Sequence, residues 1–381
     1  MSNDKKRVAV VGAGWSGAVT AERLSAGGVD VEVFERAANV GGHSRSETLN
    51  GVVYEPNGAH IFHTSNEEVT AYVQRFGLSR PYGHAVKAQV HIGDDDALTL
   101  LSWPPQLEEL RELPVWPTVE RELADLAPEP AGEDFETFVK SLMGTTLYNL
   151  FIRDYTAKQW GRPATELSSS FAPKRVELRD DGFRRLFRDR WEFFPAEGMN
   201  SVIEGVLAKS SVTCGAEISL DDLVGMQGDY DAIVVTAPLD RLLGRDGDLE
   251  WRGIHLRSRY VPVEDPDETL TAAYVVNWPD ARYPFTRTVE TKHATGQRIC
   301  GTVVSEEFPG APARHYPVPT VDRRFELLND QYKDEVRAAL DRPVYFCGRL
   351  ANYLYINQDQ AIEQGFACSA EVLADLGGSR P

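Results

Sequence analysis

The first part of the chain combines a short apolar run, three spaced glycines and an acidic residue. Residues 8–11 lead directly into Gly12-x-Gly14-x-x-Gly17, and a helix-like segment and a second strand pattern ending at Glu35 follow. In such a strand–turn–helix–strand unit, the first glycine permits a tight turn and the second lets backbone amides approach a pyrophosphate. The third lets the helix lie close to the strand. The sequence therefore predicts a Rossmann-like unit that binds a dinucleotide at the helix N-terminus, with Glu35 accepting hydrogen bonds from a ribose.

A second glycine pair, Gly41-Gly42, follows the acid. An NAD-binding unit usually needs nothing beyond the acid, whereas another close backbone approach suits the flavoproteins that hold FAD. The alternative is an ordinary glycine-rich turn on the surface. We interpret the pair as a sign of FAD and assign the contacts expected at the two glycine clusters to Gly12, Gly14, Trp15, Ser16, Gly17, Glu35, Arg36, Gly42, His43 and Ser44.

The composition is that of an acidic globular protein. The 381 residues suffice for two or three domains, and a net charge of −18 argues against nucleic acid and anionic membranes as partners. No apolar run approaches the length of a membrane span. Lysines precede an apolar stretch at the start, as in a signal peptide, but the glycine fingerprint occupies that stretch and Glu22 follows it. We therefore expect a cytoplasmic protein that is not exported.

No cluster of residues in the sequence indicates a metal. His60 and His63 are three positions apart in an extended segment, where such side chains point to opposite faces. The four cysteines are widely spaced, without a Cys-x-x-Cys motif, which fits a reducing compartment and neither a metal site nor a disulfide framework. They are Cys214, Cys300, Cys347 and Cys368.

One segment reverses the acidic charge. Residues 174–190 hold seven basic residues against four acids, a net charge of +3. Guanidinium groups bind phosphates through paired hydrogen bonds, so this segment is a candidate anion site. The alternative is a solvated face in which the charges form salt bridges. Composition alone leaves both interpretations open.

The remaining patterns predict an α/β protein whose nucleotide-binding domain is discontinuous. Residues 230–239 and 343–350 have the pattern of short buried strands, as expected for returns to the first sheet. A helical pattern runs over residues 134–154. Strand-like runs occupy residues 84–101 and 251–305.

Several motifs occur in one order over nearly the whole chain. They are GAGWSG, VGGH, GAHIFHT, YTAKQWGR, the basic segment, PFTR, YPV and GRLANYLY. This ordered set resembles the flavin-dependent UDP-galactopyranose mutases. The match is densest in residues 7–78, 147–198, 283–293 and 343–366, and it is weak in residues 84–133, where this chain is shorter.

The resemblance implies three domains: a discontinuous Rossmann-like FAD domain, a helical domain and a twisted antiparallel sheet. We expect the FAD domain to comprise residues 1–80, 196–240 and 342–381. The helical domain is expected over residues 103–168. The antiparallel sheet domain, which also holds substrate, is expected over residues 81–102, 169–195 and 241–341.

The resemblance also implies the chemistry. The family interconverts the pyranose and furanose forms of a nucleotide-linked hexose, with UDP-galactose as the default substrate. FAD must be reduced, by NAD(P)H or another reductant, so that its N5 can attack the anomeric carbon and displace the nucleoside diphosphate. We expect a nucleotide sugar as the partner molecule and a homo-oligomer.

Motif by motif, the resemblance implies the following site. Arg179 matches the mobile-loop arginine that grips the diphosphate, and Arg287 matches the second arginine, which supports the flavin and the leaving group. Two cations there would stabilise the charge that develops as the C–O bond breaks. His63 matches a histidine near the flavin and is expected to be catalytic together with the two arginines. His60 and Arg349 are expected to touch the cofactor. The remaining substrate contacts are expected from Tyr155, Trp160, Trp191, Tyr316 and Tyr355.

Four residues depart from the family pattern. Trp191 stands where a tyrosine is usual, and Asn357 replaces an aspartate. His315 replaces a tyrosine before the Tyr-Pro pair, and His43 replaces an asparagine beside the second glycine pair. The two arginines are retained, so the chemistry is expected to persist. A modified or deoxy sugar, or another base, stays open as an alternative to UDP-galactose.

Two rival interpretations remain. An FAD oxidoreductase of the amine-oxidase or desaturase type shares the N-terminal fingerprint and would turn over with oxidised flavin. A nucleotide-sugar binder that has lost catalysis would explain the departures, although retention of Arg179 and Arg287 argues against it.

Overall fold

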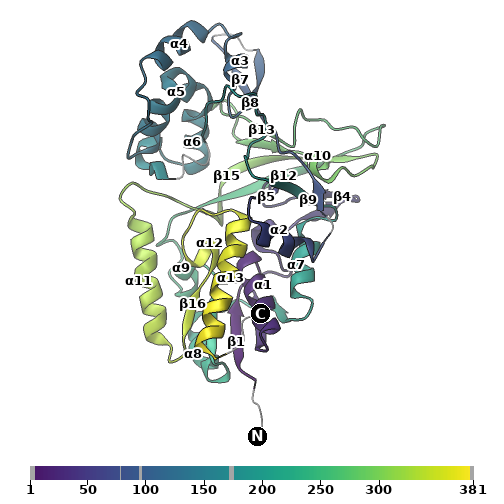
Figure 1. The fold of residues 1–381 in the computed structure, drawn as a ribbon, viewed down its shortest axis with the longest axis vertical. Coiled ribbons are helices and arrows are strands. Elements are labelled where there is room, and N and C mark those ends of the chain that lie inside the picture. The colour runs from purple at the N-terminus through teal and green to yellow at the C-terminus, as the bar shows by residue number, and fades with distance from the viewer. Residues whose placement is uncertain (1–4, 78, 94–96, 171–175, 378–381) are drawn as a thin grey trace.

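The computed structural model describes residues 5–77, 79–93, 97–170 and 176–377. The first lobe surrounds a parallel sheet, and the second, called the helical lobe, consists of helices. A long sheet lies between the two lobes (Figure 1).

The parallel sheet has five strands in the order β10-β2-β1-β11-β16. Their bounds are β1 (Arg7–Val11), β2 (Asp30–Glu35), β10 (Ser211–Cys214), β11 (Ala232–Val235) and β16 (Val344–Phe346). The predicted Rossmann-like sheet is confirmed, including the returns at β11 and β16. The sequence reasoning missed β10, because this edge strand is mostly exposed and lacks an apolar alternation.

Helices cover both faces of this sheet because its central strands are apolar on both sides. Val8 and Val10 face one core, and Ala9 and Val11 face the other. The first face is covered by α1 (Trp15–Ala26), α2 (Glu67–Gln74), α7 (Met199–Leu207) and α13 (Gln358–Asp375). The second face is covered by α8 (Leu220–Met226), α9 (Leu239–Leu242), α11 (Arg324–Ala339) and α12 (Gly348–Ala351).

The long sheet has the order β12-β15-β14-β13-β7-β8. Its strands are β7 (Val86–His91), β8 (Leu98–Trp103), β12 (Trp251–Val261), β13 (Val275–Asn277), β14 (Arg287–Val289) and β15 (Thr302–Pro317). Neighbours are antiparallel except β13 and β7, which run parallel, so the sheet is mixed. This pair joins two distant parts of the chain, whereas β13 and β14 are consecutive strands that pair Asn277 with Arg287.

The helical lobe packs on the end of the long sheet (Figure 1). It contains α3 (Leu107–Leu110), α4 (Trp116–Ala124), α5 (Phe135–Phe151) and α6 (Arg153–Trp160). The helix predicted over residues 134–154 is present but kinked at Gly144, which has φ +80° and ψ 170°. Glu122 of α4 accepts hydrogen bonds from Thr146 at this kink, 2.7 Å from its backbone N–H. A side chain at Gly144 would clash with Glu122, so the glycine lets α4 approach.

Two small antiparallel sheets and short helices complete the fold. The three-stranded sheet has the order β5 (Phe62–Thr64), β9 (Trp191–Pro195) and β6 (Ser79–Pro81), and β3 (Glu47–Leu49) pairs with β4 (Val52–Tyr54). The short helices are η1 (Gly42–Ser44), η2 (Ala164–Glu166), η4 (Gln227–Asp229) and α10 (Lys292–Thr295). Among the described residues, no helix has both the length and the apolar character that crossing a membrane would need.

Candidate functional site

The two glycine clusters meet at the N-terminus of α1. Gly12 turns the chain at φ +106°, and its N–H donates to Phe34 O at 2.7 Å. A Cβ on Gly17 would lie 2.0 Å from Gly12 O, so only glycine allows this close packing. A Cβ on Gly14 would meet no atom within 4 Å, and one on Gly42 would lie 3.3 Å from Gly14 Cα. Gly14 therefore borders open space at the helix N-terminus, where no side chain caps the helix.

Glu35 ends β2 beside this turn and is almost fully buried. Its two carboxylate oxygens accept hydrogen bonds from the backbone N–H groups of Ala13 and Ala37, both at 2.8 Å. Each oxygen keeps a second lone pair. The backbone thus fixes the carboxylate in place, and it can still accept hydrogen bonds from a ribose hydroxyl.

A cluster of neutral histidines lies beyond the glycines. The His43 ring stacks on His315 of β15, with centroids 4.3 Å apart. Burial, with the Arg349 cation nearby, lowers the pKa of His60 to about 3 and that of His315 to about 4. Burial also lowers the pKa of His43 well below its ordinary value. These rings are therefore uncharged at neutral pH.

His315 carries a buried donor that the described residues leave unused. The N–H of Ile254 donates to its Nδ1 at 3.2 Å, so the proton of the neutral ring lies on Nε2. Nε2 is buried and has no hydrogen-bond partner among the described residues. Buried donors are normally paired, which indicates that a bound molecule supplies an acceptor here. Together with the open space at Gly14, this fits a dinucleotide cofactor that extends from the glycines toward the histidines.

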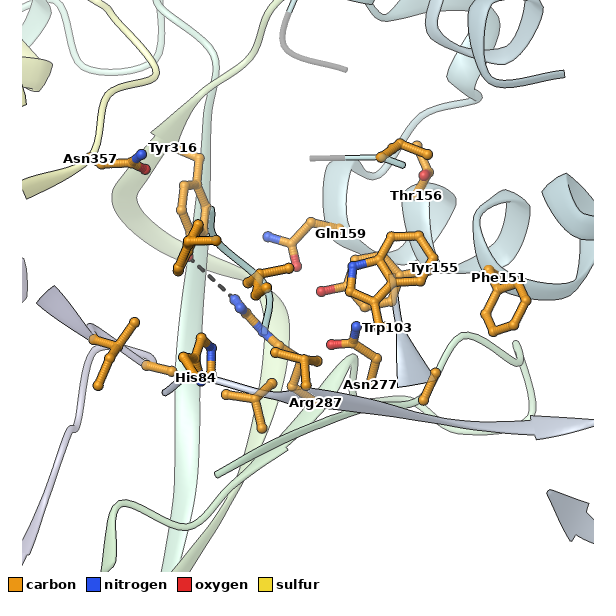
Figure 2. Close-up of a pocket in the computed structure, with 18 of the residues that line it drawn as sticks. His84, Trp103, Phe151, Tyr155, Thr156, Gln159, Asn277, Arg287, Tyr316 and Asn357 are labelled. Carbon is orange, nitrogen blue, oxygen red and sulfur yellow. Dashed lines mark hydrogen bonds between the residues drawn. The ribbon is translucent and has the colours of Figure 1, made fainter. Parts of the chain in front are cut away.

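A cavity opens between the helical lobe and the long sheet. The wall from α5 and α6 includes Phe151, Tyr155, Gln159 and Trp160, and the wall from the sheet includes Asn277, Arg287 and Tyr316 (Figure 2). The remaining side is lined by His60, His63, His84, Arg349, Tyr355 and Asn357. Most residues predicted for cofactor and substrate contacts in the C-terminal two thirds of the chain thus meet at one cavity.

Arg287 projects into the middle of this cavity (Figure 2). Its Nε and Nη2 donate to Glu307 Oε1 at 2.9 and 2.7 Å, and Nη2 lies 3.5 Å from the Tyr316 hydroxyl. Glu307 is completely buried. Within the described residues, Nη1 of Arg287 forms no hydrogen bond. The ion pair holds the guanidinium in one orientation and leaves one nitrogen for an anionic ligand.

Aromatic side chains form part of the cavity wall near this cation. Trp160, Tyr316 and Tyr355 have ring centroids between 5.7 and 6.3 Å apart. The Arg349 guanidinium lies 5.7 Å from the ring centroids of both Tyr316 and Tyr355. Such a wall can stack against a base or a sugar while its hydroxyl groups donate hydrogen bonds.

His63 is oriented by two contacts. Its Nδ1 lies 2.7 Å from Asp189 Oδ2, and its ring stacks on Phe187 at 3.5 Å between centroids. His60 also lines the cavity, with Nδ1 at 2.6 Å from Gly58 O. Both histidines reach one cavity because β5 begins only at Phe62, so strand alternation does not apply to His60. No group of three or more histidine, cysteine or acidic residues able to hold a metal is found among the described residues.

Arg179 lies apart from this cavity. It is buried, pairs with Glu177, and donates to the carbonyl oxygens of Phe183, Arg185 and Leu186. The guanidinium thus closes the loop formed by its own segment. Trp191 does not line the cavity either: it packs beside the core of the first lobe and under Arg190.

The rest of the basic segment is mostly ion-paired. The pairs are Arg184 with Glu108 and Glu109, Arg185 with Glu192, Arg188 with Glu177 and Asp181, and Arg190 with Glu67. Lys174 and Arg175 lie outside the described residues. The sequence left open whether this segment is an anion site or a salt-bridged face. For these four arginines, the structure shows the salt-bridged face.

Sequence reasoning missed several residues of the site. Gln159, Asn277 and His84 line the cavity, and Glu307 orients Arg287. His84 belongs to a strand-like run without a distinctive motif, and Glu307 lies just beyond another such run. Gln159 lies within the YTAKQWGR motif, between the two aromatic residues that were singled out, and was the one detectable from the sequence.

Comparison with known proteins identifies the family. Residues 150–355, more than half of the chain, match the family described as UDP-galactopyranose mutase. The chain belongs to the UDP-galactopyranose mutase family. This is a family of isomerases, and residues 10–76 match an NAD(P)-binding Rossmann-like domain.

Curated relatives and a solved structure match over nearly the whole chain. A probable UDP-galactopyranose mutase from Klebsiella pneumoniae is 26% identical, over 98% of this chain and 96% of the relative. A dTDP-fucopyranose mutase from Escherichia coli is 25% identical, over 95% and 97%. The solved structure of a reduced UDP-galactopyranose mutase shares the fold, with a TM-score of 0.74 at 18% identity over 97% and 96% of the two chains.

Proposed function

We propose that this protein is an FAD-dependent mutase that interconverts the pyranose and furanose forms of a nucleotide sugar. UDP-galactose is the default substrate. The observation that carries the proposal is the oriented Arg287 guanidinium, which stands in an aromatic-walled cavity next to the histidines that adjoin the glycine clusters.

The cofactor assignment rests on how the residues fit the group. The open space at Gly14 and the fixed Glu35 carboxylate suit a pyrophosphate and a ribose, and the unused donor of His315 suits a further acceptor on the same molecule. Reduced FAD, when bound, would supply the nucleophilic N5 that the reaction requires.

The protein's own residues bind and orient the substrate. Tyr155 and Trp160 provide flat faces for the base and sugar, and Tyr316 and Tyr355 provide hydroxyl donors for the diphosphate. Nη1 of Arg287 would contact the diphosphate oxygens and stabilise the negative charge that develops when the bond to the anomeric carbon breaks. The ion pair with Glu307 pre-orients this cation, so little reorganisation is needed at the reactive moment.

We propose a different part for Arg179. Its donors are engaged by three carbonyl groups and Glu177, so it would reach a diphosphate only after its loop opens. In the arrangement described, it organises the loop, and Arg287 is the cation that meets the substrate.

The choice of sugar and base to propose depends on the residues that depart from the family pattern and on the substrates for which the relatives are named. One relative is named for UDP-galactopyranose and another for dTDP-fucopyranose, and Asn357 at the cavity replaces the charge expected there. We therefore include a deoxy sugar and a thymidine nucleotide among the proposed substrates.

The test is a panel of nucleotide sugars that includes UDP-galactopyranose and dTDP-fucopyranose. Each is incubated with oxidised enzyme and with dithionite-reduced enzyme, and products are separated by chromatography and assigned by NMR. We expect the furanose isomer only with reduced enzyme and no net consumption of reductant. Oxygen uptake with oxidised enzyme, and no isomer from any substrate, would instead establish the oxidoreductase.

A further inference from the structure

Lys158 binds a connection that adjoins the cavity. It belongs to α6, and its Nζ donates to four backbone carbonyl groups. These are Trp278 O at 2.6 Å, Asp280 O at 2.9 Å, Tyr283 O at 3.1 Å and Phe285 O at 3.0 Å. An ammonium has three N–H groups, so the four acceptors share them and fill its hydrogen-bonding capacity.

All four carbonyl groups belong to the connection between β13 and β14. Asn277 ends β13, Arg287 begins β14, and the two are paired across the hairpin. Trp278 N–H donates to Thr286 O at 2.8 Å and closes the base of the connection. Both Asn277 and Arg287 line the cavity. Holding this connection therefore holds the cavity wall that carries the cation.

The backbone of Lys158 belongs to the opposite wall. Tyr155, one turn earlier, and Gln159, the next residue, line the cavity from α6. The end of α6 is also tied to β12, because Arg252 donates to the carbonyl groups of Gln159 at 2.8 Å and Lys158 at 3.0 Å. Lys158 is thus the residue whose main chain supports one wall and whose side chain fixes the other.

No carboxylate lies within 4.0 Å of the Lys158 ammonium among the described residues. Its charge is balanced at close range by carbonyl dipoles, so removing it leaves no buried carboxylate unpaired. A compact ammonium suits acceptors that converge from several directions, whereas the planar guanidinium of arginine does not.

We propose that Lys158 is a positioning residue that sets the separation of the two cavity walls and thereby the affinity for the nucleoside diphosphate part of the substrate. This inference rests on the proposed function, because it takes a nucleoside diphosphate as the ligand of the cavity. A role in stability alone would lower the free energy of unfolding and leave that affinity unchanged.

The experiment compares Lys158→Met, Lys158→Arg and wild-type holoenzyme, with UDP and dTDP as probes. Dissociation constants are measured by calorimetry, and FAD content and the visible flavin spectrum confirm that the first lobe is intact. Lys140→Met is the matched control, since Lys140 lies in neighbouring α5 and its ammonium contacts only residues of that helix in the described structure: Glu136 at 2.6 Å and the Tyr148 ring at 5.0 Å from its centroid. We expect the dissociation constant to rise about tenfold or more for Lys158→Met, because small misplacements of binding groups have large effects. The control should stay within about twofold of wild type.

Lys158→Arg retains the charge and serves if Lys158→Met does not fold. It should also bind the nucleotide more weakly, with faster hydrogen exchange of the amides in residues 278–286. Nucleotide affinity equal to wild type in a folded Lys158 variant overturns the inference. Absence of UDP and dTDP binding by the wild-type holoenzyme would instead reject the proposed function, so the two failures are distinguishable.

Discussion

Replacing Arg287 by methionine should cost both stability and turnover, and the two losses can be separated. The side chain of Glu307 is completely buried, and its Oε1 accepts both hydrogen bonds from Arg287. Its Oε2 has no hydrogen-bond partner among the described residues. Without the arginine, the carboxylate keeps only the weaker contact from the Thr286 hydroxyl at 3.2 Å. Leaving one partner of such a buried pair alone costs about 3–5 kcal/mol of unfolding free energy.

The catalytic loss has a different origin and a similar size. A preorganised group that stabilises developing negative charge contributes about 10²–10³-fold in kcat, or about 3–4 kcal/mol of activation free energy. Adding Glu307→Gln to Arg287→Met removes the unpaired charge. The double variant should therefore recover most of the stability but none of the turnover.

Urea unfolding measures the first effect, and furanose formation by the reduced enzyme measures the second. A double variant with kcat within about threefold of wild type would refute the assignment of Arg287 to the leaving diphosphate, since the expected loss is about 10²-fold or more. A single Arg287→Met variant as stable as wild type would refute the argument from the buried ion pair.

Two further predictions concern Gly14 in the first lobe and the buried carboxyl group of Glu55. Gly14→Ala should leave the free energy of unfolding within about 1 kcal/mol of wild type, because the added Cβ meets open space. The variant should nevertheless bind less FAD, as measured by the absorbance of bound flavin. Gly225→Ala, whose Cβ also meets open space, is the control and should keep its FAD. Burial raises the pKa of the Glu55 carboxyl to about 8, although hydrogen bonds from Tyr274 and the His60 N–H oppose the shift. The folded state then keeps a proton that the unfolded state releases, so this group stabilises the fold fully below pH 4.5 and loses that contribution as pH rises through 8. Glu55→Gln should flatten the decline in unfolding free energy between about pH 5 and about pH 9 by a few kcal/mol, and denaturant titrations that show the same decline in both proteins would contradict this.

The sequence predicts best those features in which neighbouring residues form one local unit. The glycine spacing and Glu35 determine a strand, a turn and a helix start, so the first lobe follows from a short stretch of chain. The helix over residues 134–154 was predicted from its apolar period, but that period continues through Gly144 and does not reveal the kink.

Features that depend on distant partners could not be predicted in this way. Glu307 is one acidic residue among many until β15 lies beside β14 and brings it to Arg287. The motif suggested that Arg179 faces an anion, but motif position does not specify which acceptors a flexible side chain meets, and here they are carbonyl groups of its own segment. Likewise, the YTAKQWGR motif gives no sign that Lys158 reaches the connection between β13 and β14.

The order of strands in the parallel sheet sets the order in which this chain can fold as it leaves the ribosome. β1 can pair with β2 as soon as both have been synthesised. Its other neighbour, β11, begins at Ala232, and β16, which pairs with β11, begins only at Val344. Until then the growing chain carries an open strand edge, the kind of surface that invites aggregation and chaperone binding. The last helix, α13, then packs against α1, where Gly365 lies directly against Val19. Assembly of the first lobe therefore waits until α13 has been synthesised, and a ribosome-stalled fragment that ends before α13 should remain sensitive to protease throughout this lobe.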